Sequence, residues 1–308
     1  MGLNLVMVAR DAAPSAAFEL VKGELQDIFC ARAFLGKGKP LKESVEQITE
    51  SVQRANVVVL GMSSQPELAK EELAAGKAAA EAGVPYGFYC DTFGCHQRPW
   101  FSDLREKASF LLVPNEEESK KAEKIFPNAE ITVSSNPILE NSAFPNISRK
   151  DARIKLGVED DEVMVLLSGH KSLPITCFLA VSMVHAAHNP TLFKKKIKIF
   201  LSLHPGDLSP AGTYDDLVKF SSVPVKVVNK DVMLTDDMLS AADLVVESAS
   251  TLCPAAAYQR KPIVSYFSEI SYQRNVGVFG QREWEPCVMG ISREVRGDPL
   301  ALSMAVED

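Results

Sequence analysis

The sequence lacks the short glycine-rich motifs that mark many nucleotide-binding and hydrolytic enzymes. No G-x-G-x-x-G follows the first predicted strand, where residues 10–15 are RDAAPS, and this argues against a Rossmann dehydrogenase. The sequence also has no G-x-x-x-x-G-K-[ST] and no G-x-S-x-G. The first absence argues against a P-loop NTPase, and the second removes support for a serine hydrolase.

The chain also lacks positive charge and long apolar runs. Its 308 residues carry a net charge of −7, which argues against nucleic acids and anionic membranes as general partners. No apolar run reaches the roughly 18 residues of a spanning helix, so no transmembrane segment is expected. Residues 3–9 follow no basic residue and are too short for a signal peptide, so they predict a first strand.

Paired cysteines are missing as well. Only Cys90 and Cys95 lie close together, and no second pair or paired histidines complete a zinc pattern. We therefore expect no metal, no cofactor, and reduced thiols in a cytoplasmic protein. The six cysteines are Cys30, Cys90, Cys95, Cys177, Cys253 and Cys287.

The chain alternates strands and helices twice, and 308 residues exceed what one core comfortably holds. Apolar strands between amphipathic helices are typical of a parallel sheet covered on both faces. We predict an α/β fold with two facing Rossmann-like domains, residues 1–140 and 150–308, and a linker within 135–148. Expected strands are 3–9, 27–34, 57–60, 86–90, 110–113, 131–133, 163–167, 197–203, 225–228, 244–246 and 263–264. Expected helices include 14–25, 41–54, 66–82, 116–125, 173–185 and 233–241.

The stretch 241–266 has the most informative pattern of the second half. A short buried strand at 244–246 is followed by a polar turn and a helix, which Ser250 or Thr251 can cap and which has Pro254 in its first turn. A helix N-terminus at the end of a strand favours an anion such as phosphate. The alternative is an ordinary βαβ corner whose hydroxyls only cap the helix.

Three strand ends of this half carry small or polar residues: 168–172, 204–207 and 247–251. The first is a glycine-containing turn that suits a diphosphate through backbone N–H groups and Lys171. His204 can donate to a phosphate or stack against a base, although a histidine before a proline can also be a plain turn residue. Three such ends in one domain favour a phosphate-bearing ligand.

In the first half, Asp91 follows the strand 86–90, and we expect Asp91, His96 and Arg98 on the wall that faces the second half. A carboxylate in a cleft can take a proton from an acceptor hydroxyl, so Asp91 is a candidate general base. The alternatives are a helix cap or an ion pair with Arg98.

Two further polar pairs end strands of the first half. Arg10 and Asp11 follow the first strand and either line the same cleft or are surface turn residues. Ser63 and Ser64 follow strand 57–60 and cap the next helix at least as plausibly as they contact a ligand.

The order of several short motifs resembles the GT-B glycosyltransferase superfamily. The layout is similar to UDP-N-acetylglucosamine 2-epimerases, lipid A disaccharide synthases and teichoic-acid glycerophosphotransferases, over most of the chain. The matching segments are VVVLGMSS, EAGVPYGFYCD and SSNP in the first half, and RKDARIKLGVEDDEVMVLLSG, LSLHPGD, ADLVVESASTL and AAAYQRKPIV in the second.

The resemblance implies that the second domain binds a nucleotide-diphosphate sugar, UDP-linked, and that the first domain holds an acceptor, whose identity is open. Asp91 and Arg98 are then near the reacting sugar. Residues implied near the donor are Ser168, Gly169, His204, Ser248, Ser250 and Thr251. A homo-oligomer is left open.

We therefore predict a glycosyltransferase that binds its donor in the interdomain cleft, with Asp91 as base and Lys171 stabilising the leaving diphosphate. Two alternatives stay open. One is a 2-epimerase-like enzyme, which needs several acid or base groups; Asp11, Asp91 and Glu247 are the candidates. The other is a non-catalytic ligand-binding protein, favoured because 253–255 lacks the glutamate that usually binds the ribose in this superfamily.

Overall fold

A computed structural model describes residues 3–25, 27–188, 196–204, 207, 209–229, 232–273 and 284–307. The chain divides into two compact units, which we call unit 1 (Met1–Ile138) and unit 2 (Leu139–Asp308). This boundary lies inside the stretch 135–148, where the sequence places the linker. The roles assigned to the two domains, and the cleft predicted between them, stay predictions.

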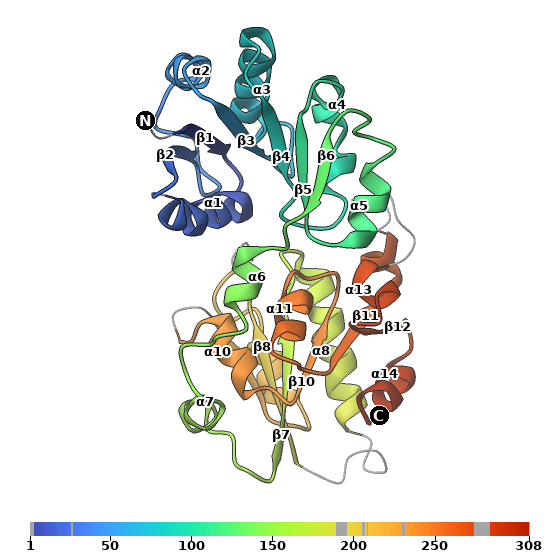
Figure 1. Ribbon diagram of the computed structural model, residues 1–308. Helices are drawn as coiled ribbons and strands as arrows, with labels where there is room; N and C mark the ends of the chain where they lie inside the picture. The colour runs from blue at the N-terminus through green and yellow to red at the C-terminus, as the bar shows by residue number, and fades with distance from the viewer. Residues whose placement is uncertain are drawn as a thin grey trace. The chain divides into compact units, whose positions relative to one another are not determined.

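Each unit contains a parallel sheet covered by helices on both faces (Figure 1). Within the described residues each sheet has six strands, in the order β2-β1-β3-β4-β5-β6 in unit 1 and β12-β11-β10-β7-β8-β9 in unit 2. All the strand pairs are parallel. The predicted fold class, α/β with two Rossmann-like parallel sheets, is confirmed.

The strands of unit 1 are β1 Leu3–Ala9, β2 Phe29–Leu35, β3 Val57–Gly61, β4 Tyr86–Tyr89, β5 Phe110–Val113 and β6 Glu130–Val133. Its helices are α1 Ala12–Glu24, α2 Val45–Gln53, α3 Lys70–Ala82, η1 Cys95–Gln97, η2 Pro99–Phe101, α4 Ser102–Arg105 and α5 Glu116–Ala122. Helix α6, Pro137–Asn141, spans the boundary between the units.

The strands of unit 2 are β7 Glu162–Ser168, β8 Lys196–Ser202, β9 Val225–Val228, β10 Leu244–Glu247, β11 Ile263–Phe267 and β12 Arg293–Arg296. Its helices are α7 Arg149–Leu156, α8 Leu173–Ala187, α9 Asp215–Phe220, α10 Thr235–Ala241, α11 Leu252–Tyr258, α13 Glu285–Val288 and α14 Pro299–Glu307. In the described part of the chain, no helix combines the length and apolarity needed to cross a membrane.

The two faces of each sheet pack into separate cores, because successive side chains of a strand point to opposite faces. In β1, Val6 and Val8 join the core under α2 and α3, whereas Leu5 and Met7 join the core under α1. In unit 2 the same alternation divides β7 between the cores formed with α8 and with α10. Strands buried on both faces explain the continuous apolar runs of the sequence.

Several helices begin at different residues from those predicted. Helix α1 begins earlier than expected, because the Asp11 carboxylate caps it by accepting the Ala12 amide. Helix α2 begins later than expected, at a capping box in which Ser44 and Gln47 each satisfy the other's backbone amide. Apolar periodicity extends beyond such a cap and so does not locate the first residue of a helix.

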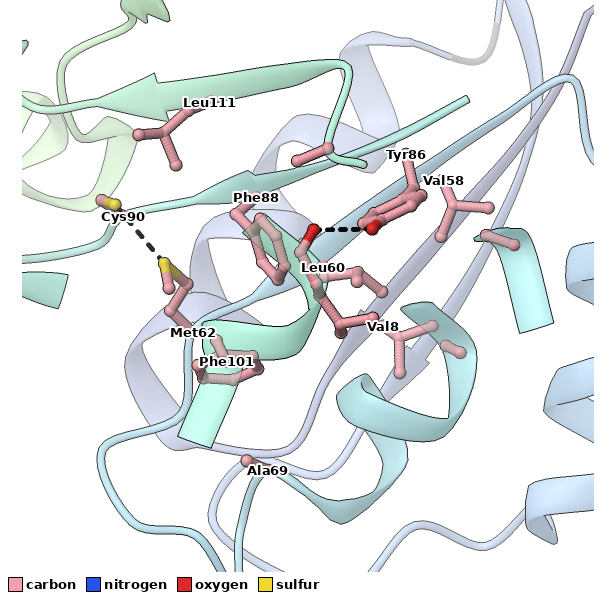
Figure 2. Close-up of a cluster of buried hydrophobic side chains, with 14 of the residues drawn as sticks. Val8, Val58, Leu60, Met62, Ala69, Tyr86, Phe88, Cys90, Phe101 and Leu111 are labelled. Carbon is pink, nitrogen blue, oxygen red and sulfur yellow. Dashed lines mark hydrogen bonds between the residues drawn. The ribbon is translucent and has the colours of Figure 1, made fainter. Parts of the chain in front are cut away.

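Phe88 on β4 is the centre of an aromatic cluster in the unit 1 core (Figure 2). Its side chain is fully buried, and its ring lies edge-on to Phe101 at 5.5 Å and to Phe126 at 5.8 Å. Edge-to-face pairs of this kind add to the free energy gained by burial.

We expect Phe88→Ala to lower the free energy of unfolding of unit 1 by about 3–5 kcal/mol, because it removes a buried ring and leaves a cavity. Urea denaturation followed by circular dichroism measures this. Phe144→Ala is the control, since Phe144 is 79% exposed. Equal losses in the two variants would contradict the assigned core.

Candidate functional site

The sheet of unit 2 reverses its winding between β7 and β10. From β7 the chain continues to β8 and β9 on one side, and then returns to place β10 on the other side of β7. Ligands of open parallel sheets bind outside the carboxyl ends of the strands at such a switch point. Ser168 ends β7 and Ser250 follows β10, and their hydroxyl oxygens lie 2.8 Å apart at this point.

The turn after β10 is held by side-chain hydrogen bonds. Ala249 has a left-handed backbone (φ 52°), and the Ser250 amide donates to the Glu247 carboxylate at 2.5 Å. The Ser250 hydroxyl accepts the Leu252 amide at 3.2 Å, so Ser250 supplies the cap of α11. Thr251 is exposed and makes no capping hydrogen bond through its side chain.

Ser248 differs from its neighbours in this turn. Its hydroxyl is buried and has no hydrogen-bond partner among the residues that the structure describes. A buried hydroxyl without a partner is costly, and it is a feature of sites that a ligand completes.

The turn after β7 is tightly packed. A Cβ atom at Gly169 would lie 2.7 Å from the Ser202 carbonyl oxygen, so only glycine fits there. The Gly169 amide donates to Ser202, the His170 amide to Thr176 and the Ser172 amide to Nδ1 of His170. These three amides are therefore engaged within the protein, which limits the backbone donors that the sequence suggested for a diphosphate.

Lys171 and His204 form the basic part of this edge. Both side chains reach solvent. The covered part of the His204 ring, together with the nearby Lys171 charge, lowers the pKa of His204, against the opposite effect of Asp207. The His204 ring centroid lies 6.4 Å from that of His170. The sequence analysis did not single out His170, although its position one residue after Gly169 places it in the same turn.

Glu247 lies directly beneath the turn. It is fully buried and accepts hydrogen bonds from the Ser265 hydroxyl and the Ser250 amide. Burial raises its pKa to about 7, although these hydrogen bonds act in the opposite direction. Because the carboxylate anchors the turn from below, Glu247 positions Ser250.

In unit 1 the corresponding strand ends form a hydroxyl–carboxylate network. One Asp11 oxygen accepts from the Ser64 hydroxyl at 2.6 Å and from the Ser64 amide at 2.9 Å. The Ser63 hydroxyl donates to Glu72 at 2.6 Å. The capping role considered for the two serines is wrong, because α3 begins at Lys70 and has no side-chain cap.

Asp91 lies at the end of β4 with its side chain only 10% exposed. Its Oδ1 lies 4.0 Å from Nη1 of Arg98 and accepts from the Cys95 thiol at 3.3 Å. The Asn136 side chain donates to the Asp91 carbonyl oxygen at 2.6 Å and fixes the backbone there. Asp91 and Arg98 are therefore neighbours, as the sequence predicts. They also form the ion pair that the sequence analysis gave as an alternative to a catalytic role.

Asp11 and Asp91 have pKa values shifted in opposite directions. Burial raises the pKa of Asp91, and the opposing effects of Arg98 and the Cys95 hydrogen bond do not cancel it. Burial acts in the same direction on Asp11, but its hydrogen bonds to Ser64 and to a backbone amide outweigh burial and lower the pKa. The Asp11 charge contributes to the raised pKa of Asp91, so the pair is electrostatically coupled.

His96 does not lie on an exposed wall, and this prediction is wrong. Its side chain is fully buried, and Nδ1 lies 3.2 Å from a carboxylate oxygen of the equally buried Glu118. The same oxygen accepts the Gly94 amide at 2.5 Å. The histidine thus belongs to the support of the 94–98 loop.

Glu72 on α3 is a buried carboxyl that the sequence analysis missed. Its Oε1 accepts from Ser63 and from the Arg10 amide, and Oε2 has no hydrogen-bond partner in the described part of the chain. Burial raises its pKa to about 8, and the neighbouring Glu71 acts in the same direction. Arg10 pairs with Glu71 at 3.2 Å.

Among the residues with described positions, no three or more His, Cys, Asp or Glu side chains come together to hold a metal ion.

No protein-family model and no curated protein matches the sequence. Solved structures do. The chain is similar to UDP-GlcNAc 2-epimerase from Neisseria meningitidis bound to UDP-GlcNAc (14% identity, TM-score 0.62, covering 99% of this chain and 90% of that one). It is similar to the epimerase from Methanocaldococcus jannaschii (15%, 0.64, 100% and 92%) and to HepE from Anabaena in complex with UDP (12%, 0.59, 99% and 89%).

At these identities the similarity concerns the fold. Together with the two parallel sheets, it shows that the chain has the GT-B fold, and the fold that the resemblance implied is confirmed.

Glu72 provides a test of the unit 1 network through pH. The folded state holds the Glu72 proton up to about pH 8, whereas the ordinary pKa is 4.5. Between these values the folded state binds more protons, so the free energy of unfolding falls as pH rises from 4.5 to about 8. Glu72→Gln should reduce this fall, as measured by urea denaturation across that range. Glu81→Gln, at an exposed position of the same helix, should keep it; an unchanged fall in Glu72→Gln would contradict the assignment.

Proposed function

We propose that the chain binds a UDP-linked sugar and acts on the sugar by acid–base chemistry, in the manner of a nucleotide-sugar 2-epimerase. The observation that carries this proposal is the placement of Asp91, largely buried at the end of β4 and 4.0 Å from Arg98, near enough to Asp11 for the Asp11 charge to act on it. Burial raises the pKa of Asp91, whereas hydrogen bonds lower that of Asp11. Opposite shifts of two neighbouring carboxyl groups are typical of an acid and a base with separate roles.

Unit 2 supplies the nucleotide-binding half of this function. Its switch point offers the hydroxyls of Ser168, Ser248 and Ser250. Lys171 adds donors and a positive charge, and His204, whose pKa is lowered, adds a ring that can form hydrogen bonds. A diphosphate suits this set because its oxygens accept from hydroxyls and cations alike. The proposal has further support from proteins with this fold, since the Neisseria epimerase is bound to UDP-GlcNAc and HepE to UDP.

Unit 1 supplies the acid–base half. Inversion at C2 requires that its proton leaves one face and returns on the other, and this needs two groups. Because C2 has no neighbouring carbonyl, the electron pair forms a C1=C2 double bond as the diphosphate leaves C1, and the diphosphate adds back to C1 when C2 is reprotonated. We assign these two roles to Asp11 and Asp91, the two carboxyl groups that follow β1 and β4. The Arg98 guanidinium is suited to stabilise negative charge that develops on the sugar.

Glycosyl transfer, the function first predicted, is the second candidate. It needs a single base, and Asp91 can fill that role once it is ionised. The coupled pair favours the epimerase-like function, because a transferase leaves Asp11 without a chemical task. The non-catalytic alternative predicts ligand binding without any turnover.

The sugar chemistry is tested by incubating the protein with UDP-GlcNAc in D₂O. We expect deuterium at C2 of the sugar, detected by proton NMR, and a second product with inverted C2. Asp91→Asn should lower the exchange rate about a hundredfold or more, because proton transfer by a positioned group contributes that much. Asp103→Asn, at an exposed aspartate of α4, should leave the rate unchanged.

Other outcomes decide between the candidates. Release of UDP that depends on an added acceptor, without deuterium at C2, would favour glycosyl transfer and contradict the epimerase-like proposal. UDP binding in calorimetry with no reaction under any condition would favour the non-catalytic alternative.

The nucleotide site is tested by Ser250→Ala. Loss of one hydrogen-bonding hydroxyl should weaken UDP binding about three- to tenfold, the effect of roughly 0.5–1.5 kcal/mol. Isothermal titration with UDP measures this. Ser44→Ala is a matched control, because Ser44 also caps a helix but lies in unit 1; its UDP affinity should stay that of the parent. Equal affinity in Ser250→Ala and the parent would remove the switch point from the nucleotide site.

A further inference from the structure

A cavity lies on unit 2, away from the switch point. Its volume is about 510 Å³, and it is lined by segments from residues 143–149 and 258–261 together with Ser240. Lys261 lies two residues before β11, and Ser240 lies near the end of α10, just before β10. The cavity is therefore at the amino ends of these strands, whereas Ser168 and Ser250 are at the carboxyl ends of theirs.

The described lining of this cavity has three cations, Arg149, Arg260 and Lys261, and no carboxylate. Arg149 forms an ion pair with Asp243, which is not part of the lining, and also donates to the Ala242 carbonyl at 2.8 Å. Its charge is thus partly compensated within the protein. Arg260 and Lys261 carry the rest of the positive charge of the lining.

Among the described residues, the Lys261 ammonium group makes two hydrogen bonds, which leaves one of its three donors. Its Nζ donates to the carbonyl oxygens of Ser240 at 2.9 Å and Ala242 at 3.0 Å, and an ammonium group has three donors. Burial lowers its pKa to about 8, and the like charges of Arg149 and Arg153 act in the same direction against Asp243. An anion beside it would relieve this repulsion.

Arg260 adopts a conformation that glycine would adopt at less cost. It follows α11 with a left-handed backbone (φ 55°), the position where helices commonly end on glycine. Its side chain is exposed, and its guanidinium makes no hydrogen bond or ion pair with any residue that the structure describes. The chain therefore keeps a strained arginine whose donors are all available at the cavity.

We propose that this cavity binds a small phosphate-bearing ligand, with the Arg260 guanidinium and the remaining Lys261 donor holding the phosphate. A planar guanidinium fork and an ammonium group suit the tetrahedral oxygens of a phosphate monoester. Tyr258, 40% exposed in the lining, offers a ring face to the organic part of the ligand. This site is independent of the nucleotide site, and its occupation would tie the start of α7 to the end of α11.

The first experiment is isothermal titration of the full chain with inorganic phosphate. We expect saturable binding by the parent protein and at least about a tenfold weaker affinity in Arg260→Gly, since a charge-assisted contact is lost. The melting temperature of Arg260→Gly without phosphate should not fall, because glycine suits the left-handed backbone. A folding defect therefore cannot produce the weaker binding.

A matched control is Lys37→Gly. Lys37 is also a cation with a left-handed backbone (φ 50°), but it lies in unit 1 and pairs with Glu19. Its replacement changes net charge and backbone preference in the same way and should leave phosphate affinity unchanged. Equal affinity in Arg260→Gly and the parent, or equal losses in Arg260→Gly and Lys37→Gly, would overturn the proposal.

Two further measurements separate this site from the nucleotide site. UDP affinity should be unchanged in Arg260→Gly, and phosphate affinity should be unchanged in Ser250→Ala. Phosphate binding that is lost in Ser250→Ala and kept in Arg260→Gly would place the phosphate at the switch point and overturn the proposal. Acetate should bind much more weakly than phosphate, and equal affinity for the two anions would contradict the selectivity for phosphate.

Discussion

Burial of parallel strands on both faces is the constraint on which the rest of the structure depends. The central strands β3, β4, β7 and β10 have apolar interiors, because both of their faces pack under helices. Polar residues then gather where these strands end, and parallel strands place all their carboxyl ends at one edge of the sheet. Asp91 after β4, Ser168 at the end of β7 and Ser250 after β10 follow this rule. The chemistry of each unit thus results from the layout of its core.

The same burial sets the electrostatics of these edges. Glu72 and Glu247 are fully buried carboxyl groups, and loss of water raises the pKa of both into the neutral range or above. Each of them accepts a backbone amide from a strand-end turn. Asp11 is buried less and hydrogen-bonded more, and its pKa is lowered. Differences in solvation and hydrogen bonding between carboxyl groups on similar scaffolds are therefore sufficient to give them different protonation states at one pH.

Periodicity and strand ends could be predicted from the sequence, because both depend on residues close together in the chain. The parallel sheets and the neighbourhood of Asp91 and Arg98 followed from such local patterns. The burial of His96 could not be predicted, since it depends on Glu118, which comes from a different helix. The sequence also could not show that the backbone amides of the turn after β7 are already hydrogen-bonded, because their acceptors include Ser202 on a neighbouring strand. Tertiary partners of this kind leave no local pattern.

The contact between Ser168 and Ser250 has a consequence for ligand exchange. Either hydroxyl can be the donor, and the direction of the bond is set by the rotation of two protons. A ligand that offers an acceptor, or a water that offers a donor, can thus be matched while every heavy atom stays in place. The switch point can therefore present opposite polarities to successive occupants, at the cost of turning two O–H bonds.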